Sequence, residues 1–574
     1  MREDALELAK RADVAAHVVF AVVVRQVRDP HLMPALSQYG RKVTADDAEA
    51  ARYQDFLHAV FSACSTLSGL FESQRIIAKP GTRCRPLEAI RCGHVSDTVD
   101  SVRNGSLRGR ESNQLRITEW MLERPKSCRY RDSMGASFGA PRAMRVLWLS
   151  SSPGLGAEAV GGKVGEGGGW VGALQAALRQ CEDLCLSVAF PWDVPQVRSV
   201  PSGRHEFLPF PCYPRGGRLQ RALLDLSCRL EPRSEVDHLL RVVELARPDL
   251  IHVWGTEAFF GLVAEHTRIP VLIEIQGLRG PQAEGYFSSL TKLDLLRFAS
   301  PRRLARGRSL LQRFYRYRRT AVRERRILAT ARYVSGRTDW DHSMCSVLAP
   351  DAEYFHCDRL LRAPFYQAPW RLRSKGGGEL RLVTTIRGNA YKGLETLIRC
   401  ASLLRPLLPA GLRWTVVGVR SGEEIHRIVT RKLKVSFEAL GVRLVGRQSA
   451  EGVFSQLLDH DIYVHPARIE NSPNGLCEAM LTGMPIVSTN AGGIPSLLSH
   501  GEEGLLVSTG DPWAMAGAIL QLARDRERAA SLGAAARNRA QMRHDPTAVV
   551  KTEIEIYRRV LADAVLRETA APVG

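Results

Sequence analysis

The sequence contains 574 residues, of which 45% are hydrophobic and 24% charged, and 80 Lys and Arg against 60 Asp and Glu give a net charge of +20. This length predicts several domains instead of one core, and the composition excludes a chain that is disordered throughout. The positive charge favours anionic partners such as phosphates, nucleic acid or an anionic membrane surface, without choosing among them. Glu3, Asp4 and Glu7 are unlike a secretory signal, and no apolar run approaches 18 residues. We therefore expect a soluble protein that is at most attached to a membrane.

The first 141 residues show no alternation of strands and helices. Helix-like patches such as residues 46–70 are followed by a stretch rich in Arg, Ser and Gly. We predict that residues 1–141 are a poorly ordered N-terminal extension, or that the true start is Met134 or Met144. A functional extra domain is the alternative.

Residues 142–372 carry a repeated pattern of short apolar runs and helix-period segments. We predict strands at residues 145–150, 186–190, 250–254, 271–276 and 333–335, and helices at residues 170–179 and 234–246. Continuous apolar strands that alternate with helices are typical of a parallel sheet covered on both faces. This region is therefore predicted to be a Rossmann-like domain of α/β class.

The same pattern restarts after the glycines at residues 376–378, and it predicts a second Rossmann-like domain over residues 373–545. Its predicted strands are residues 381–386, 414–417, 443–445, 462–465, 486–488 and 505–507, and its helices are residues 394–404, 423–431, 453–458, 475–482 and 513–524. Residues 546–574 are predicted to form a C-terminal helix and tail. Because ligands of such sheets bind beyond the carboxyl ends of the strands, we expect the active site in a cleft between the domains.

Two glutamates of the second domain, Glu470 and Glu478, are separated by seven residues. The first is expected in a loop after a strand, and the second in the first turn of a helix that begins near Gly475. A helix N-terminus exposes unpaired N–H groups and a partial positive charge, which suit phosphates and sugar hydroxyls. Asn474 and Gly475 allow a ligand to approach the backbone closely. Taken alone, the segment is better explained as a helix start with acidic residues nearby.

With its flanks, this segment resembles the E-x7-E signature of retaining GT-B glycosyltransferases, especially glycosyltransferase family 4 and its subgroup that makes bacterial surface polysaccharides. The resemblance continues without gaps through residues 461–466, 470–478, 483–495 and 501–507, and extends more loosely over residues 145–561. It implies that Glu478 binds the ribose of the donor nucleotide and that Glu470 contacts the transferred sugar. It also implies main-chain contacts from Asn474, Gly475 and Leu476. A carboxylate with two acceptor oxygens suits the two neighbouring hydroxyls of a ribose.

Residues 385–393, just after the first strand of the second domain, resemble the family's donor-diphosphate loop. The resemblance implies that Lys392 neutralises the charge on the leaving nucleotide, and Arg387 is the candidate companion cation. Breaking the sugar–phosphate bond leaves charge on the diphosphate, and fixed cations lower the barrier to that step. A solvated lysine at a helix start is the alternative for Lys392.

Two loops of the first domain also resemble cleft loops of the family. The glycine run that ends in Gly168, Gly169 and Trp170 corresponds to the loop that faces the donor phosphate, although a tight turn alone would explain such a run. Residues 273–278 correspond to a loop that often carries a histidine near the reacting sugar. Gln276 stands in that place here, so we list it with Glu470 as a candidate catalytic residue. An amide can hydrogen-bond a hydroxyl but cannot ionise near neutral pH.

We expect no metal site. Asp459 and Asp461, like Asp339 and Asp341, fit a D-x-D pattern, but the first pair lies at the entry of a buried strand and the second leads from a strand into a helix. The twelve cysteines and fifteen histidines show no spacing typical of a zinc site. We interpret the cysteines as buried reduced thiols.

Residues 301–326 contain eleven arginines and a single acidic residue, Glu324. The apolar and aromatic side chains between them are Leu304, Leu310, Leu311, Phe314, Tyr315 and Tyr317. A solvated helical surface is one interpretation. The other is contact with anionic lipid headgroups or with a lipid diphosphate acceptor. No motif typical of nucleic-acid binding accompanies the run, so we expect no nucleic-acid partner.

These features together predict a metal-independent retaining glycosyltransferase of surface polysaccharide biosynthesis. It would transfer a sugar from a UDP-, GDP- or ADP-sugar donor to a glycan or lipid-linked acceptor, and it would need no other cofactor. We expect a cytoplasmic enzyme that docks on the inner face of the plasma membrane through residues 301–326. The alternatives are a GT-B phosphorylase or sugar-nucleotide epimerase, and a non-catalytic basic protein that binds nucleic acid or membranes.

Overall fold

The computed structural model describes residues 142–162, 169–211, 234–367, 369–373 and 378–570. All of them belong to one compact unit, Arg110–Gly574. The predicted extension of residues 1–141 and Gly168 of the glycine-rich loop lie outside the described residues, and what we expect of them stays a prediction.

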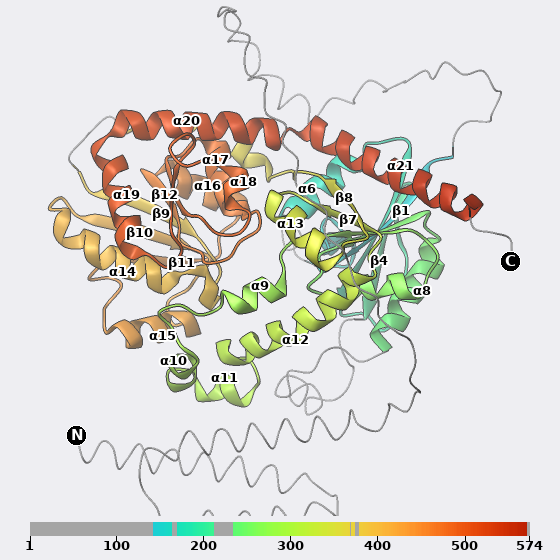
Figure 1. Ribbon diagram of the computed structural model, residues 1–574, viewed down its shortest axis with the longest axis horizontal. Helices are drawn as coiled ribbons and strands as arrows, with labels where there is room; N and C mark the ends of the chain where they lie inside the picture. The colour runs from blue at the N-terminus through green and yellow to red at the C-terminus, as the bar shows by residue number, and fades with distance from the viewer. Residues whose placement is uncertain (1–141, 163–168, 212–233, 368, 374–377, 571–574) are drawn as a thin grey trace, which may run out of the picture. The chain divides into compact units, whose positions relative to one another are not determined.

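The first sheet has eight strands in the order β3-β4-β2-β1-β5-β6-β7-β8 (Figure 1). The strands are β1 (Met144–Ser150), β2 (Leu184–Trp192), β3 (Val200–Ser202), β4 (His205–Pro211), β5 (Leu250–Trp254), β6 (Val271–Glu274), β7 (Tyr333–Gly336) and β8 (Glu353–His356). All neighbours pair in parallel except β3 and β4. The five predicted strands are confirmed. Strands β3, β4 and β8 were not predicted, and the prolines within β3 and β4 argue against strands there.

Described helices lie between the strands of the first sheet and after its last strand. They are α5 (Gly156–Ala159), α6 (Gly169–Leu178), α8 (Ser234–Ala246), η1 (Phe260–Glu265), α9 (Arg279–Glu284), α10 (Lys292–Arg297), α11 (Pro301–Ala305), α12 (Leu310–Ala329), α13 (Asp339–Leu348) and η2 (Ala363–Tyr366). Successive side chains of a strand point to opposite faces. Leu147 and Leu149 of β1 accordingly pack in one core cluster with α8, and Val146 and Trp148 pack in another with α6. The predicted helix at residues 234–246 is confirmed at both ends.

The second sheet has six parallel strands in the order β11-β10-β9-β12-β13-β14. The strands are β9 (Leu380–Thr385), β10 (Leu412–Val417), β11 (Val442–Gly446), β12 (Ile462–His465), β13 (Ile486–Thr489) and β14 (Leu505–Val507). Every predicted strand of this sheet is present, with both ends within two residues of the prediction. The two parallel sheets with helices on their faces form the GT-B fold, as predicted.

The helices of the second sheet are η3 (Ala390–Lys392), α14 (Leu394–Leu404), η4 (Arg405–Leu407), α15 (Glu424–Leu433), α16 (Ala450–Leu458), α17 (Asn474–Thr482), α18 (Ile494–Leu497), α19 (Pro512–Arg524) and α20 (Arg526–Arg543). The five predicted helices are confirmed, with α14 matched at both ends. Helix α20 was not predicted because most of its buried side chains are alanines, which give a weak apolar pattern.

The final helix, α21 (Pro546–Ala570), packs against the first sheet although it follows the second in sequence. Its Tyr557 is fully buried, and the hydroxyl oxygen accepts a hydrogen bond of 2.9 Å from Trp148 Nε1 of β1. The chain therefore crosses from the second sheet back to the first. None of the described helices is long and apolar enough to cross a membrane.

The helices between β6 and β7 contribute to the core of the second sheet. Tyr286, Leu310 and Phe314 belong to the same buried cluster as Leu397 of α14 and Trp414 of β10. This corrects one expectation for residues 301–326. Leu310 and Phe314 cannot lie among lipid headgroups, because 2% and 5% of their surfaces are exposed. Leu304, Leu311, Tyr315 and Tyr317 are partly buried, whereas Val322 is 61% exposed.

Candidate functional site

The strand order of the second sheet reverses between β9 and β12, which are paired neighbours. Ligands of open parallel sheets bind at such a reversal, beyond the carboxyl ends of the strands. The segment after β9 carries Lys392, and the segment after β12 carries Glu470. The structure brings these two candidates together: Lys392 Nζ lies 2.5 Å from Glu470 Oε1.

The glycine after Lys392 is required by the local packing. Gly393 has a φ of 76°, in the left-handed region, and a Cβ placed there would lie 2.0 Å from the carbonyl oxygen of Pro466. Only glycine allows both the turn and this close approach. The backbone after β9 is thereby packed against the backbone after β12, which holds Lys392 near Glu470.

Glu470 is held as a carboxylate in a largely buried place, with 9% of its side chain exposed. His465 at the end of β12 lies with Nε2 3.1 Å from Glu470 Oε1. Burial by itself would raise the pKa of Glu470, but the charge of Lys392 and the hydrogen bond and charge of His465 lower it to about 2. His465 was predicted only as part of a strand, and its position at the carboxyl end of that strand was the available signal.

Glu478 lies in the first turns of α17 and is paired with an arginine that we did not predict. Arg362 donates two hydrogen bonds to it, from Nε at 2.7 Å and from Nη2 at 2.8 Å. Only 4% of the Glu478 side chain is exposed, against 24% for Arg362. Burial raises the pKa of Glu478, and Arg362 opposes that rise. A ribose at Glu478 would therefore share or replace the bonds that Arg362 now makes.

The start of α17 packs tightly against the end of β9. A Cβ on Gly475 would lie 1.8 Å from Thr385 Oγ1, so glycine is needed for this contact. The N–H of Leu476 donates to the carbonyl of Pro473 at 3.0 Å. Among the described residues, the N–H groups of Asn474 and Gly475 find no acceptor. These two groups are available to a ligand at the helix start, and the main-chain contact predicted for Leu476 stays a prediction.

A buried amide joins the signature loop to the first sheet. Asn471 Oδ1 accepts a hydrogen bond of 2.9 Å from Thr338 Oγ1, and Asn471 Nδ2 donates to the carbonyl oxygens of Ile275 and Gln276 at 3.2 and 3.3 Å. Arg337 also donates to the Gln276 carbonyl, at 3.0 Å. The structure therefore places Gln276 beside the loop of Glu470 and Glu478. These bonds involve its backbone, and the catalytic role of its side chain stays a prediction.

Two further loops of the first sheet are tied together by Glu324, which we had treated as the one acidic residue of an arginine run. It accepts a hydrogen bond of 2.7 Å from Thr256 Oγ1 and one of 2.9 Å from the N–H of Arg279 at the start of α9. Burial raises its pKa to about 7, against the opposing effect of these bonds. Thr256 follows β5 and Arg279 follows β6, so Glu324 fixes two loops at the carboxyl edge.

The described part of the glycine-rich loop ends at Gly169, the first residue of α6. Its neighbour Trp170 packs against Trp254 at the end of β5, with ring centroids 5.0 Å apart. The guanidinium of Arg359 lies 3.4 Å from the centre of the Trp170 ring. These contacts anchor the helix that follows the loop at the carboxyl edge of the first sheet. The donor contact predicted for Gly169 stays a prediction.

Arg387 precedes Lys392 by five residues in the segment after β9. It lines a pocket of about 270 Å³ that none of Lys392, Glu470 and Glu478 lines. The sequence had grouped Arg387 and Lys392 as companions around one diphosphate, and the structure gives them different immediate surroundings.

The two aspartate pairs have structural partners. Asp341 accepts a hydrogen bond of 2.8 Å from the N–H of Arg337, and Asp459 pairs with Arg381 at 2.9 Å. Within the described residues, no group of three His, Cys, Asp or Glu side chains is arranged to hold a metal ion. Among the described cysteines, Cys181 and Cys185 are half-buried and four are buried, and all six are free thiols.

Comparison with known proteins assigns the second sheet to a family. Residues 380–525 match the family model described as glycosyl transferases group 1. The amylovoran biosynthesis glycosyltransferase AmsK of Erwinia amylovora is 26% identical over 227 residues, which cover 38% of this chain and 54% of that protein. The D-inositol 3-phosphate glycosyltransferase of Corynebacterium urealyticum is 31% identical over 173 residues, which cover 29% of this chain and 40% of that protein. The chain spans about half the length, or less, of these relatives.

A solved structure supports the fold independently. Sucrose-phosphate synthase from Thermosynechococcus elongatus superposes with a TM-score of 0.53 at 19% sequence identity, and the match covers 73% of this chain and all of that one. At this identity the likeness concerns the fold alone. Residues 380–525 thus match the glycosyl transferases group 1 model, and the described part of the chain has the GT-B fold.

Proposed function

We propose that this protein is a glycosyltransferase that moves a sugar from a nucleotide-sugar donor to a glycan or lipid-linked acceptor, with retention of anomeric configuration and without a metal ion. The observation that carries the proposal is the cluster at the strand reversal of the second sheet. Lys392 and Glu470 meet there from two neighbouring segments, within the region that matches the group 1 model.

The arrangement fits the chemistry of a nucleoside diphosphate donor. The unpaired N–H groups of Asn474 and Gly475 suit a phosphate or a sugar hydroxyl. Glu478 supplies two acceptor oxygens for a ribose diol. Lys392 supplies a positive charge that stabilises the diphosphate as the sugar–phosphate bond breaks.

Glu470 is the residue that we place beside the transferred sugar. Its pKa of about 2 keeps it ionised at neutral pH, so it accepts hydrogen bonds and does not donate a proton. This state suits a carboxylate that orients sugar hydroxyls or stabilises positive charge at the reacting carbon. We propose that the acceptor hydroxyl attacks the face from which the diphosphate leaves, and that the leaving phosphate takes the proton.

We further propose that the enzyme docks on the inner face of a bacterial plasma membrane in surface polysaccharide biosynthesis. The support is electrostatic. Helices α11 and α12 carry exposed arginines, and the side chains of Arg302, Arg306, Arg318 and Arg325 form no hydrogen bond or ion pair with any described residue. Each basic side chain near an anionic lipid surface contributes about 1 kcal/mol of attraction. Because most apolar side chains of this region are at least partly buried, with Val322 as an exposed exception, docking would rest mainly on charge.

Titration of the purified protein with UDP, GDP and ADP tests the donor site. One of the three should bind, and Lys392→Ala should lower turnover of the matching nucleotide sugar more than it changes acceptor KM, because the charge acts as the diphosphate leaves. Turnover should persist in excess EDTA. A protein that binds none of the three, or that loses turnover in EDTA, would contradict the proposal.

A further inference from the structure

The pocket lined by Arg387, called the arginine pocket below, lies between helices α11 and α12 and loops of the second sheet. Arg303 and Arg313 come from α11 and α12, Arg387 follows β9, and Arg447 follows β11. The pocket therefore lies at the carboxyl edge of the second sheet, the edge at which ligands of such sheets bind.

Positively charged side chains outnumber negatively charged ones around this pocket. Four arginines line it, together with two glutamates, Glu423 and Glu424. Glu424 is buried and already accepts bonds from Arg303 Nη1 at 3.3 Å and from the N–H of Leu310 at 3.1 Å. Glu423 accepts the N–H of Arg420 at 3.1 Å. Among the described residues, neither carboxylate forms a hydrogen bond or ion pair with the other three arginines, although the charge of Arg313 opposes the rise that burial causes in the pKa of Glu424.

None of those three arginines forms an ion pair with a carboxylate of any described residue. Arg313 donates to the neutral amide oxygen of Asn389. The side chains of Arg387 and Arg447 form no hydrogen bond or ion pair within the described residues, and both are exposed. A planar guanidinium with free N–H groups is the side chain best suited to bind a carboxylate or a phosphate.

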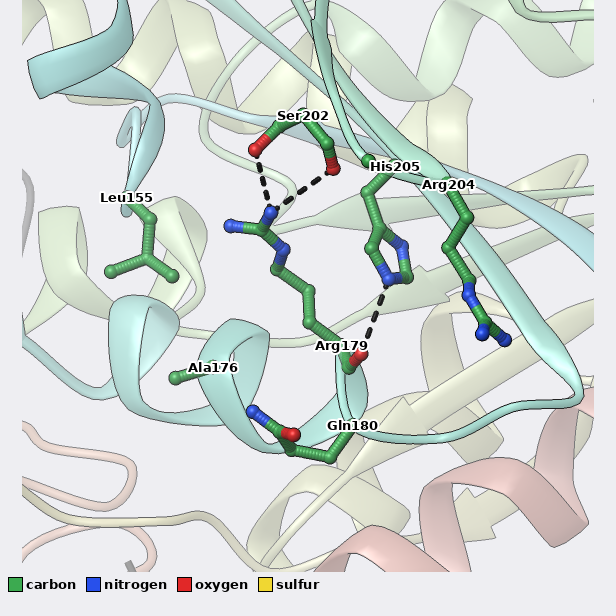
Figure 2. Close-up of a pocket in the computed structure, with 8 residues that line it drawn as sticks. Leu155, Ala176, Arg179, Gln180, Ser202, Arg204 and His205 are labelled. Atoms are coloured by element: carbon green, nitrogen blue, oxygen red, sulfur yellow. Dashed lines mark hydrogen bonds between the residues drawn. The ribbon is translucent and has the colours of Figure 1, made fainter. Parts of the chain in front are cut away.

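In a second cavity, basic residues of the lining form hydrogen bonds with neighbouring residues of the protein (Figure 2). It has a volume of about 380 Å³ and lies at the turn between β3 and β4. Arg179 donates to Ser202 Oγ at 2.6 Å, and His205 Nε2 lies 3.2 Å from the Arg179 carbonyl oxygen. His205 begins β4, so this cavity lies at the amino edge of its sheet, away from the expected ligand edge. We assign it no ligand.

The arginine pocket adjoins the donor site without coinciding with it. No residue of the signature segment at positions 470–478 lines it, and Lys392 is occupied by Glu470. Asn389 of the pocket is three residues from Lys392. Tyr317, which also lines the pocket, packs near Tyr391 with ring centroids 6.2 Å apart. A ligand group in the pocket would thus lie next to the reacting centre, on the side of helices α11 and α12.

We propose that this pocket is a subsite for an oxyanion carried by the acceptor, and that Arg313 and Arg447 select an acidic acceptor over a neutral one. The inference rests on the proposed function, since it concerns the acceptor of the same transfer. The oxyanion has two sources: the carboxylate of an acidic sugar, or the diphosphate of a lipid-linked sugar. Both offer the paired oxygens that a guanidinium recognises.

Calorimetry on the full chain, saturated with whichever nucleoside diphosphate binds it, separates these sources. The probes are tri-galacturonate for the carboxylate, inorganic pyrophosphate for the diphosphate, and maltotriose as the neutral sugar. With the donor site occupied, one anionic probe should bind and maltotriose should not. Arg313→Gln and Arg447→Gln should each weaken that binding at least tenfold and change nucleotide affinity by less than threefold. The probe that binds identifies the source.

Arg443→Gln is the matched control, because Arg443 is exposed on β11 and does not line the pocket. It should leave both affinities unchanged. Arg447→Gln keeps the test decisive if Arg313→Gln fails to fold, since Arg447 has no described partner. Failure of both anionic probes to bind the nucleotide-saturated protein would overturn the inference. So would equal loss of nucleotide affinity in the two pocket variants, which would assign the pocket to the donor. Absence of any nucleotide binding would instead overturn the proposed function.

Discussion

Arg362 and Glu478 form a two-point pair, in which both oxygens of a nearly buried carboxylate accept N–H groups of one guanidinium at 2.7 and 2.8 Å. Arg362 lies on the segment that leads from the first sheet to the second, and Glu478 lies in α17. The residue that we assign to the donor ribose is therefore already charge-compensated by the segment that connects the two sheets.

Glu478→Ala should weaken binding of the bare nucleoside diphosphate by about tenfold or more, because a hydrogen bond to a charged group contributes roughly 1.5–3 kcal/mol. Arg362→Gln should make that affinity depend on pH. Without the guanidinium, burial raises the pKa of Glu478 further, so binding should weaken from pH 8 to pH 6 more than in the wild type. Calorimetry at the two pH values measures both effects.

Arg371→Gln is the control for Arg362→Gln, since Arg371 is exposed and has no described partner. It should behave as the wild type at both pH values. Unchanged nucleotide affinity in Glu478→Ala would remove the ribose assignment.

Lys392→Met should lower stability at neutral pH and have less effect in acid. The pKa of Glu470, about 2, lies below its ordinary value of 4.5, so the ionised pair adds to the free energy of unfolding above about pH 4.5 and this contribution is lost as pH falls toward 2. Removing the ammonium leaves a buried carboxylate with less compensation, at a cost of about 1–3 kcal/mol at pH 7. Urea unfolding at pH 7 and pH 3 measures the difference. An equal loss at both values would show that Lys392 stabilises the fold by packing.

Gly475→Ala should displace the start of α17 and lower activity. The added Cβ would lie 1.8 Å from Thr385 Oγ1, and over-packing of this kind costs about 1–3 kcal/mol. Thr385→Ala in the same chain removes the clashing oxygen and should restore part of the lost stability and turnover. Gly517→Ala in α19 is the control: nothing lies within 4 Å of its Cβ, and alanine in a helix should be neutral or stabilising by up to about 1 kcal/mol. Full activity in Gly475→Ala would contradict the tight contact.

Flotation with liposomes tests docking through the exposed arginines. Wild-type protein should float with vesicles that contain anionic lipid, float less as salt is added, and not float with neutral vesicles. Changing four unpartnered arginines to glutamine should reduce flotation: Arg302, Arg306, Arg318 and Arg325. Arg313 and Arg316 are left intact because both make hydrogen bonds within the fold.

The control for flotation removes the same number of charges from other surfaces. Arg371, Arg443, Arg524 and Arg528 are exposed, and their side chains have no described partner. Their replacement by glutamine should leave flotation nearly unchanged. Equal loss in the two variants would mean that net charge, not the surface of α11 and α12, determines binding.

Deletion of residues 1–141 should leave an active enzyme. The first described strand begins at Met144, and every residue of the candidate site follows it. The truncated chain should keep its nucleotide affinity and its turnover in the same assays. Loss of solubility or of turnover would show that the extension is a functional part of the protein.

The sequence by itself predicted all six strands of the second sheet and five of the eight strands of the first, because these are short apolar runs that can be recognised without distant contacts. It also indicated Glu470, Glu478 and Lys392, since a signature of fixed spacing on a strand–loop–helix unit is a local feature. Tertiary structure decided what these residues touch. Arg362 lies on the connecting segment, and Asn471 lies in the signature loop. Each forms its side-chain hydrogen bonds with residues more than 100 positions away in the sequence. The arginine run shows the same limit: charge is visible in a sequence, but which arginines meet a carboxylate, a neutral amide or no described partner depends on how the helices pack.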